Sequence, residues 1–331
     1  MNARKWNGLG IMSKVIIVLV TFLLLPSMLF AQKYPTKPIN LVVSSGPAGS
    51  HDMSTRMLIT PAEKLLGQPF IVTNKAEGGG SVALGILAKE RADGYYIGSV
   101  PSYNFTIVPL MRKVTYSLED FVSVLTYANM PIMIAVRADS GWKTFKEFVE
   151  YARNNPGKVT YSLSGVNSAF YVGMEHIRHK EGIEWAAMPY PKGNPYLPLL
   201  GKHVQATASG PTCLPNVKSG ELRVLATMNE NRWKVLPDVP TLRELGYDFS
   251  AEINFSIVAP KATPSAVVSR LHDSFRSCIN DAEFVNYIEK MGMEVRYLDS
   301  ETSLKYLYQS RDNFSRLIKA LNIQTEYENK K

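Results

Sequence analysis

Short apolar runs alternate with amphipathic segments from residue 38 almost to the end of this chain. Residues 39–43 predict a strand, because this run is short and rich in aliphatic side chains. Residues 51–66 predict a helix, because Met53, Met57 and Leu58 recur on one helical face. Strands that alternate with helices form βα units, so we expect an α/β fold with mostly parallel sheets.

The rest of the chain continues this pattern. Further strands are predicted at 70–73, 95–100, 121–127, 132–137, 159–162, 184–188, 204–208, 222–228, 253–259 and 295–297. Further helices are predicted at 81–89, from a Thr144 N-cap to Pro156, and at 169–180, 263–280, 283–291 and 302–321. We expect the pair Thr263-Pro264 to be an N-cap followed by a proline in the first helical turn.

The first 31 residues have the features of a secretory signal peptide. Arg4, Lys5 and Lys14 precede an apolar run at 15–25, and Ala31 is a small residue suitable for cleavage. A permanent membrane anchor is the alternative, but a span needs about 20 apolar residues and this run has only about 11. We therefore expect export to the periplasm, and the cleavage site itself stays open.

The charge of the chain limits its partners only weakly. Removing residues 1–31 takes three cations and no acids from a formal net charge of +8, which leaves +5. This mildly basic balance is compatible with an anionic solute. A nucleic-acid-binding protein would concentrate its Lys and Arg on one face, whereas here they are scattered singly along the chain. We expect no nucleic-acid partner.

Two strand-to-helix junctions carry small hydroxyl residues and glycines. The first spans residues 43–52 and the second spans residues 161–168. Small residues let a ligand approach the backbone, and the start of a helix offers unpaired N–H groups and a favourable dipole for an anion. Ordinary N-capping is the alternative, because Ser and Asn are favoured at N-caps without any ligand. The sequence leaves both interpretations open.

Motifs for catalysis, nucleotide binding and metal binding are missing from the sequence. Residues 78–80 are a glycine run before a helix, but their spacing is not that of a dinucleotide-binding fingerprint. His176 and His179 lie three residues apart without a third ligand motif nearby. We therefore predict no cofactor and no metal. We expect Cys213 and Cys278 to stay unpaired, although export to an oxidising compartment would permit a disulfide.

Several segments, in order over nearly all of the chain after residue 31, match one family pattern. They are 34–39, 47–52, Asn74 with Gly79-Gly80, 93–95, 155–158, 161–165, 220–226, 236–241 and 259–264. The most specific is Leu-Pro-Asp-Val-Pro-Thr at 236–241. Together they resemble the extracytoplasmic solute receptors of tripartite tricarboxylate transporters, also called the Bug family.

The resemblance implies a two-lobed periplasmic-binding-protein fold of type II. By that analogy residues 32–133 and 256–331 form lobe one, and residues 134–255 form lobe two. Each lobe would be a mostly parallel sheet flanked by helices, and crossing hinge strands would join the lobes. The resemblance also implies a small organic acid as ligand, held by main-chain N–H groups, hydroxyls and ordered waters. Two integral membrane subunits would receive this acid from the receptor, which we expect to be a monomer.

The resemblance places the ligand at the two junctions. The predicted lobe-one contacts are Ser45, Gly49, Ser50, His51 and Asp52. The predicted lobe-two contacts are Ser164, Gly165, Asn167 and Ser168, with Tyr190 and Ser209 nearby. Further candidates after the third strand are Ser102 and Tyr103. We expect Asp52 to order the first loop or to accept a hydrogen bond from a ligand ammonium, because burying a carboxylate beside an anion is costly.

The chain departs from the family pattern at these junctions. Ser45 stands where an aromatic residue is usual, Ala48 replaces a glycine, and His51 replaces a small hydroxyl residue. Ala169-Phe170 stands where a histidine usually follows the second loop, and the lysine of the usual Tyr-Lys-Gly-Gly motif is displaced to Lys192. These departures leave the ligand class open.

Hinge closure around a bound acid is the leading hypothesis, because contacts to both lobes would favour the closed form. Two rival functions stay open. A secreted enzyme would use His51 and Asp52 as its reactive pair. A sensor-type receptor would present its closed form to a membrane kinase instead of a transporter.

Overall fold

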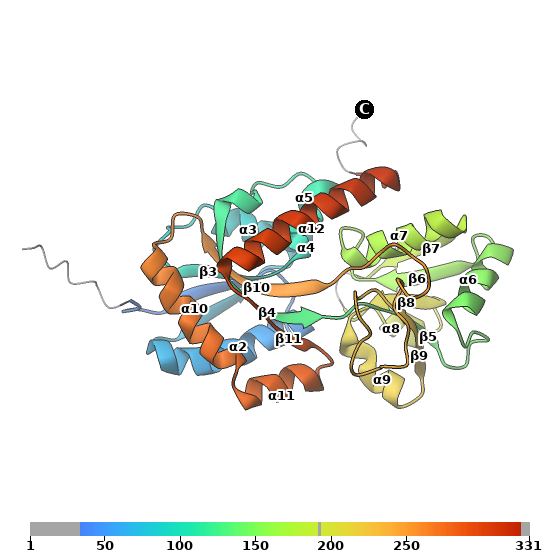
Figure 1. Ribbon diagram of the computed structural model, residues 1–331, viewed down its shortest axis with the longest axis horizontal. Coiled ribbons are helices and arrows are strands. Elements are labelled where there is room, and N and C mark those ends of the chain that lie inside the picture. Colours follow the sequence, from blue (N-terminus) through green and yellow to red (C-terminus); the bar gives the residue numbers. More distant parts are fainter. Residues whose placement is uncertain (1–33, 191–192, 326–331) are drawn as a thin grey trace, which may run out of the picture. The chain divides into compact units, whose positions relative to one another are not determined.

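The computed structural model describes residues 34–190 and 193–325, and its long elements follow the predicted order. The expected signal segment, residues 1–31, lies outside the described residues, as does Lys192. From Lys37 onward the chain forms one compact unit with two β-sheets (Figure 1). Among the described residues, no helix has the length and apolar character needed to cross a membrane.

The first sheet has six strands. In spatial order they are β11 (Glu294–Leu298), β4 (Phe121–Met130), β10 (Ile253–Pro260), β3 (Tyr96–Pro101), β1 (Ile39–Val43) and β2 (Phe70–Asn74). β1 pairs in parallel with β2 and β3, whereas β10 pairs antiparallel with β3 and β4, and β11 pairs antiparallel with β4. β1 to β4 therefore point the same way, and β10 and β11 run against them.

The second sheet has five strands. In spatial order they are β7 (Trp185–Pro189), β6 (Val159–Leu163), β8 (Ala206–Ser209), β5 (Met133–Arg137) and β9 (Leu222–Thr227). β6 pairs in parallel with β7 and β8, whereas β5 pairs antiparallel with β8 and β9. The expectation of mostly parallel sheets is correct for strand direction. In pairing, both sheets are mixed, because β10 and β5 are each inserted between strands that point the other way.

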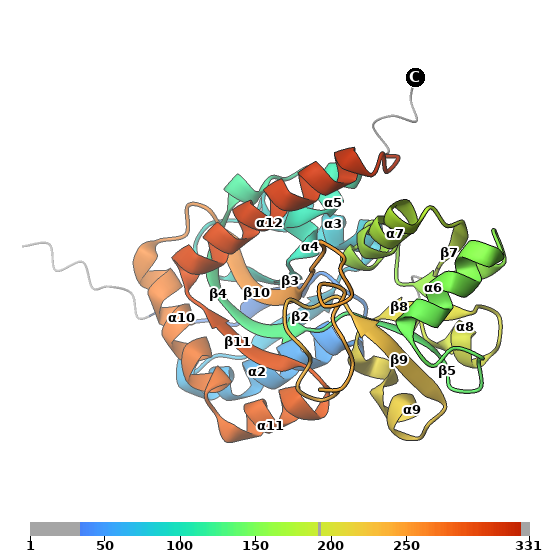
Figure 2. The ribbon, with the colours of Figure 1, turned by 45° about the vertical axis from the view of Figure 1, so that its right-hand side comes forward.

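The longer helices agree with the sequence prediction to within a few residues. They are α2 (Ser50–Leu66), α3 (Ser81–Leu87), α6 (Phe145–Asn154), α7 (Ala169–Glu181), α10 (Ser265–Ile279), α11 (Ala282–Lys290) and α12 (Ser300–Ala320). On the first sheet, α2, α10 and α11 lie together on one face, and α3 and α12 lie on the other (Figures 1 and 2).

Several short helical segments were not predicted from the sequence. They are α4 (Tyr103–Thr106), α5 (Val108–Met111), α8 (Leu197–Leu200), α9 (Leu214–Lys218) and the 3₁₀ turns η1 (Glu77–Gly80), η2 (Leu118–Asp120) and η3 (Pro211–Cys213). Each has at most five residues, which is too short for a helical period of apolar residues to be recognised.

Two helix N-caps were predicted from the sequence, at Thr144 and at Thr263. Thr144 caps α6 as expected: its hydroxyl oxygen accepts a hydrogen bond from the Glu147 N–H, and the Glu147 carboxylate accepts one from the Thr144 N–H. The Thr263 cap is wrong. Pro264 has an extended ψ of 139°, so α10 begins only at Ser265, and the Thr263 hydroxyl instead donates to the Pro260 carbonyl oxygen at 2.7 Å.

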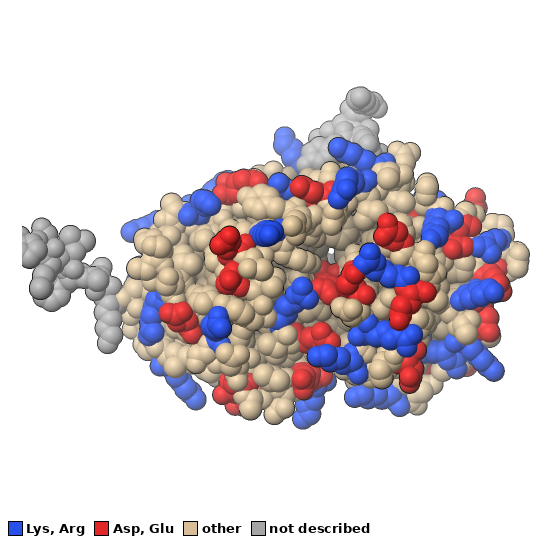
Figure 3. Space-filling model, viewed as in Figure 1, with Lys and Arg blue, Asp and Glu red and all other residues tan. Residues whose placement is uncertain are grey.

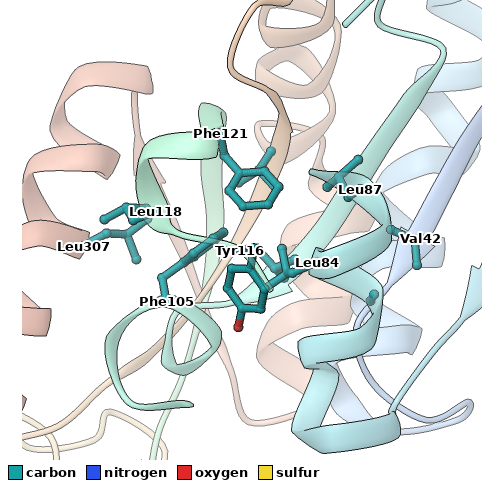
Figure 4. Packing of buried hydrophobic residues seen from close by; sticks show 11 residues of the cluster. Val42, Leu84, Leu87, Phe105, Tyr116, Leu118, Phe121 and Leu307 are labelled. Carbon is teal, nitrogen blue, oxygen red and sulfur yellow. The ribbon is translucent and has the colours of Figure 1, made fainter. Parts of the chain in front are cut away.

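A hydrophobic cluster fixes the segment that follows β3. It joins the sheet to α3 and α12, and its labelled members are Val42, Leu84, Leu87, Phe105, Tyr116, Leu118, Phe121 and Leu307 (Figure 4). The Phe105 ring packs edge-on against Phe121 and Tyr116, with centroid distances of 5.3 and 6.3 Å. The Tyr116 hydroxyl donates to the Asn104 carbonyl oxygen at 2.6 Å, so the cluster anchors α4 beside the end of β3.

The glycine run at 78–80 provides close packing beside the first junction. All three glycines have a left-handed φ, and the Gly79 carbonyl oxygen accepts from the Asn104 side-chain amide at 2.5 Å. The Ser44 hydroxyl donates to the Asn104 side-chain oxygen at 2.7 Å. A Cβ on Gly80 would lie 2.6 Å from the Ser44 carbonyl oxygen, so only glycine fits at this position.

We predict that Gly80→Ala lowers the free energy of unfolding by more than Gly67→Ala does. Both residues have a left-handed φ, 90° and 73°, which costs an alanine about 1–2 kcal/mol. Only at Gly80 does the new Cβ also meet a backbone oxygen, since the space around Gly67 is open. We expect an additional loss of roughly 1–3 kcal/mol for the Gly80 variant in urea unfolding. Equal losses for the two variants would contradict this packing role.

Candidate functional site

The carboxyl ends of β1, β2 and β3 meet at one edge of the first sheet. Val43 at the end of β1 pairs with Asn74 at the end of β2 and with Ser99 in β3. The predicted residues at 44–52 and 102–103 follow these strand ends. In open α/β sheets, ligands bind outside the carboxyl ends of the strands, so this edge is the expected place for a site.

The second sheet presents its candidates in the same way. Leu163 at the end of β6 pairs with Pro189 at the end of β7, and β8 runs parallel to both. The candidates of the second junction, at residues 164–168, therefore lie just beyond the carboxyl edge, where β6 ends. Tyr190 follows the end of β7, and Ser209 is the last residue of β8.

A short crossing makes these two edges adjoin. β4 ends at Met130, which pairs with Ile253 beside the carboxyl end of β3. β5 begins at Met133, which pairs with Ser209 and Thr227 at the carboxyl ends of β8 and β9. The chain covers at most about 11 Å between the Cα atoms of Met130 and Met133. The carboxyl edges of the two sheets therefore meet where β4 passes into β5.

The second crossing is hydrogen-bonded to the first. The Ile132 carbonyl oxygen accepts from the Met228 N–H at 2.9 Å, and the Ile132 N–H donates to the Asn229 side-chain oxygen at 3.1 Å. The Asn129 side-chain amide donates to the Asn254 side-chain oxygen at 3.0 Å. These bonds join the two crossings into one connection between the sheets.

Asp52 organises the first loop. Its carboxylate accepts hydrogen bonds from the Ala48 N–H at 2.9 Å, from the Asn74 amide at 2.9 Å and from the Arg56 guanidinium at 3.0 Å. Burial alone would raise the pKa of Asp52, but the hydrogen bonds from Arg56, Asn74 and Ala48 outweigh burial and hold this pKa below its usual value. Of the two roles expected for Asp52, the structure favours ordering the loop.

His51 lies in a chain of hydroxyl groups. Its Nδ1 is 2.9 Å from the Ser45 Oγ, and its Nε2 is 2.9 Å from the Ser99 Oγ. Thr55 and Tyr127 continue the chain beyond Ser99. Burial lowers the pKa of His51 to about 3, although the nearby Asp52 charge acts in the opposite direction. The imidazole is therefore neutral at physiological pH.

These contacts do not support the rival enzyme. Neither ring nitrogen of His51 is hydrogen-bonded to Asp52, because the ring faces Ser45 and Ser99, and the carboxylate faces Arg56 and Asn74. A general base works best with a pKa near the working pH, and burial holds the pKa of His51 far below that range, at about 3.

The candidates after β3 are largely occupied by contacts within the protein. Ser102 is buried, its N–H donates to the Asn254 carbonyl oxygen at 2.8 Å, and its hydroxyl accepts from the Asn254 N–H at 3.2 Å. Ser102 therefore links β3 to the crossing strand β10. Tyr103 is only partly exposed, and burial raises the pKa of its phenol to about 12, so the hydroxyl keeps its proton.

The helices at the two junctions begin without side-chain caps. Gly49 is the N-cap of α2 and Ser168 is the N-cap of α7, and neither helix start receives a side-chain cap hydrogen bond. The side chains of Thr144, Asp281 and Asp299 do cap α6, α11 and α12, whereas α3 and α10 also begin without a side-chain cap. Ser168 thus occupies the N-cap position that ordinary capping predicts, but at neither junction does a side chain accept from the first N–H groups of the helix.

The second junction keeps several polar groups accessible. Ser164 is exposed, and Gly165 and Asn167 are partly exposed. Ser168 is buried, and its hydroxyl donates to the Gly165 carbonyl oxygen rather than capping α7. Tyr190 remains 38% exposed, while its N–H donates to the Leu163 carbonyl oxygen at 2.7 Å. This edge therefore offers hydroxyl, amide and aromatic groups to a ligand.

Two other predicted site residues, and both cysteines, are buried. Ser209 is fully buried, and its Oγ lies 3.8 Å from the Cys213 Sγ. Ser50 opens α2 and is also buried. Cys213 and Cys278 are buried free thiols, which confirms the expectation that they stay unpaired. Residues 34–190 and 193–325 contain no group of three or more metal-ligating side chains.

Three residues that surround His51 were not identified from the sequence: Thr55, Ser99 and Tyr127. Thr55 is four residues along the same helix, so its position beside His51 follows from helical geometry. Ser99 and Tyr127 come from β3 and β4, and their approach depends on the strand order, which the sequence alone did not reveal.

Comparisons with known proteins show the family of the chain. The family model described as "Tripartite tricarboxylate transporter family receptor" matches residues 55–323. The chain belongs to this receptor family. A relative from Cupriavidus necator, "UPF0065 protein in gbd 5'region", is 34% identical over 304 residues, which cover 90% of this chain and 92% of the relative.

Solved structures of the receptor type share the fold. The periplasmic binding protein BugD is 27% identical, with a TM-score of 0.80 over 88% of this chain and 100% of BugD. An R. palustris protein with adipate is 24% identical, with a TM-score of 0.81 over 88% of this chain and 99% of that protein. Both the family resemblance and the two-lobed α/β fold of periplasmic binding proteins are confirmed.

We predict that His51 makes the protein less stable as the pH falls. An unfolded histidine binds a proton near pH 6.5, whereas folded His51 binds one only near pH 3. Stability should therefore be complete above about pH 6.5 and decline toward pH 3, by up to about 1.4 kcal/mol per pH unit. Unfolding curves of the wild type and His51→Asn between about pH 4 and 7 measure this slope. The variant should show a shallower decline, and parallel curves would contradict the assignment.

Proposed function

We propose that the protein is an extracytoplasmic receptor that captures a small organic anion, a carboxylate, between two lobes. The observation that carries this proposal is the pair of uncapped helix starts, α2 and α7, on adjoining carboxyl edges. Each start offers main-chain N–H groups and the positive end of a helix dipole, which favour an anion. Two such starts on different sheets can bind one carboxylate ligand from both sides.

The charges near the first junction are compatible with an anionic ligand. Asp52 is the negative group closest to that loop, and its charge is paired with Arg56 at 3.0 Å. The His51 ring carries no charge at neutral pH. The anion would therefore meet hydrogen-bond donors and dipoles at this junction rather than an unpaired carboxylate.

Closure of the two lobes would follow from this division of contacts. We propose lobe limits that follow the sheets, with the change of lobe at residues 131–132 and between Thr227 and Ile253. These limits differ by a few residues from the limits 133/134 and 255/256 expected from the sequence. A ligand that contacts both junctions binds the closed form better, and this difference in affinity supplies the free energy of closure.

The partners follow from the family. We propose that residues 1–31 direct export to the periplasm, and that the monomeric receptor delivers its ligand to two integral membrane subunits of a tripartite transporter. The adipate in the R. palustris protein, a dicarboxylate, supports a carboxylate ligand. On the face in Figure 3, Lys and Arg are interspersed with Asp and Glu, which gives no support to a nucleic-acid partner.

The double variant Ser164→Ala, Asn167→Ala tests the proposed site. Both side chains are accessible and follow β6, so their removal should leave the melting temperature of the unliganded protein nearly unchanged. A thermal-shift screen with mono-, di- and tricarboxylates and acidic amino acids would first find acids that stabilise the wild type. We expect the variant to lose most of that stabilisation.

A matched control uses a serine and an asparagine at the opposite edge of the second sheet. Ser219 and Asn216 lie just before β9 begins, and both hydrogen-bond to Glu221. The variant Ser219→Ala, Asn216→Ala should keep the full ligand-induced shift. If the Ser164 and Asn167 variant kept it too, the second junction would not be part of the binding site.

A further inference from the structure

The hydroxyl chain around His51 has one accessible end. Ser99, Thr55 and Tyr127 are completely buried, and His51 is 6% exposed, whereas Ser45 is partly exposed in the first loop. Ser45 is thus the most exposed residue of this chain, and through it the buried groups can act on a bound solute. The direction in which its hydrogen points depends on how hydrogens are distributed along the chain.

The hydroxyl hydrogen of Thr55 can be assigned without knowing the others. The Thr55 Oγ1 is 2.7 Å from the His51 carbonyl oxygen, and a carbonyl can only accept, so Thr55 donates there. Thr55 also lies 2.8 Å from the Ser99 Oγ and 2.9 Å from the Tyr127 hydroxyl, and these two oxygens are 3.1 Å apart. The Ser54 hydroxyl, 3.5 Å from that of Tyr127, donates to the His51 carbonyl oxygen at 3.0 Å, so its hydrogen is used there. Only the hydrogens of Ser99 and Tyr127 remain for these three contacts. We assign both hydrogens to Thr55, so that its 2.8 Å contact with Ser99 and its 2.9 Å contact with Tyr127 are hydrogen bonds. The longer contact between Ser99 and Tyr127, at 3.1 Å, is then left without a hydrogen.

This distribution determines the tautomer of His51. Because the Ser99 hydrogen points to Thr55, the 2.9 Å contact between Ser99 and the His51 Nε2 needs a hydrogen on Nε2. A neutral imidazole has only one N–H, so its Nδ1 accepts a hydrogen bond from Ser45. With the hydrogen on Nδ1 instead, Ser99 would have to donate to Nε2. Thr55 has one hydrogen, which could then go either to the His51 carbonyl oxygen at 2.7 Å or to Ser99 at 2.8 Å. The other of these two short contacts would have no hydrogen.

The tautomer leaves Ser45 as an acceptor. Its single hydrogen is bound to the His51 Nδ1, so the exposed side of its oxygen carries only lone pairs. A carboxylate has no hydrogen to give and gains nothing from such a group. A hydroxyl or ammonium group donates to it, and an unsubstituted ligand would leave the Ser45 oxygen without a partner after closure.

We propose that Ser45, oriented by His51, recognises a hydrogen-bond donor on the ligand, so that the receptor prefers carboxylic acids with a hydroxyl or ammonium substituent. The inference rests on the proposed function and refines its ligand class. The helix starts bind the carboxylate, and Ser45 selects the substituent.

The test compares acids that share a carbon skeleton. Succinate, malate and aspartate form one set, and glutarate, 2-hydroxyglutarate and glutamate form another. In calorimetric titrations, the wild type should bind the better of the hydroxyl and amino acids of a set about tenfold more tightly than the unsubstituted acid. Ser45→Ala should remove this preference, and it should bind the unsubstituted acid at least as tightly as the wild type does, because the oxygen that this acid leaves without a partner is gone. Comparing the hydroxyl with the amino member shows which donor Ser45 recognises.

Two results would overturn the inference while the proposed function stands. One is binding by the wild type without preference for a substituted acid. The other is an equal loss of affinity for all members of a set in Ser45→Ala, which would place Ser45 on the carboxylate. If no acid of either set and no acid of the thermal-shift screen binds, the proposed function fails, and this inference fails with it.

Nitrogen-15 NMR of histidine-labelled protein tests the tautomer without any ligand. We expect the hydrogen of His51 on Nε2 in the wild type and in Tyr127→Phe, because Ser99 still donates to Thr55 in that variant. A hydrogen on Nδ1 in the wild type would make Ser45 a donor to the ligand and would contradict the inference.

Ser164→Ala is the control for the calorimetric titrations, and it should weaken the binding of all members of a set together.

Discussion

The two-residue link between β4 and β5 is the constraint on which the rest of this structure depends. Because β4 ends at the carboxyl edge of the first sheet and β5 begins at the carboxyl edge of the second, so short a link keeps the two edges adjacent. Ile132 accepts a hydrogen bond from the Met228 N–H and donates one to the Asn229 side chain, and these bonds hold the returning chain against the link. The strand ends that carry the predicted ligand contacts therefore lie on the two edges that this link joins.

The first junction has no unpaired charge from Asp52 or His51, and it presents the N-terminal end of the α2 helix dipole. Asp52 is neutralised by Arg56, and His51 is neutral because it is buried. The starts of α2 and α7 have no side-chain cap, so their N–H groups are available to an anion. Affinity for an acid would then come from backbone dipoles, and selectivity would come from the orientation of a few hydroxyl hydrogens.

The long elements and both junctions were predictable, because apolar periodicity and small residues before a helix are local signals. What the sequence could not reveal depends on contacts between distant strands. Ser102 is an attractive candidate in the sequence, but it pairs with Asn254, 152 residues away. Ser209 ends a strand as expected, yet its side chain is buried beside Cys213. The mixed sheets likewise follow from β10 and β5 inserting between strands that are separated from them in sequence.

The central claim is that one acid bridges two adjoining carboxyl edges and closes the lobes. The most direct measurement is the distance between spin labels at Glu77→Cys, beside the first sheet's edge, and Asn194→Cys, beside the second's. Both positions are exposed and outside the proposed contacts, and both native thiols are buried. Adding the acid that stabilises the protein most should shorten this distance and narrow its distribution. An unchanged distance with bound acid would contradict closure between the two edges.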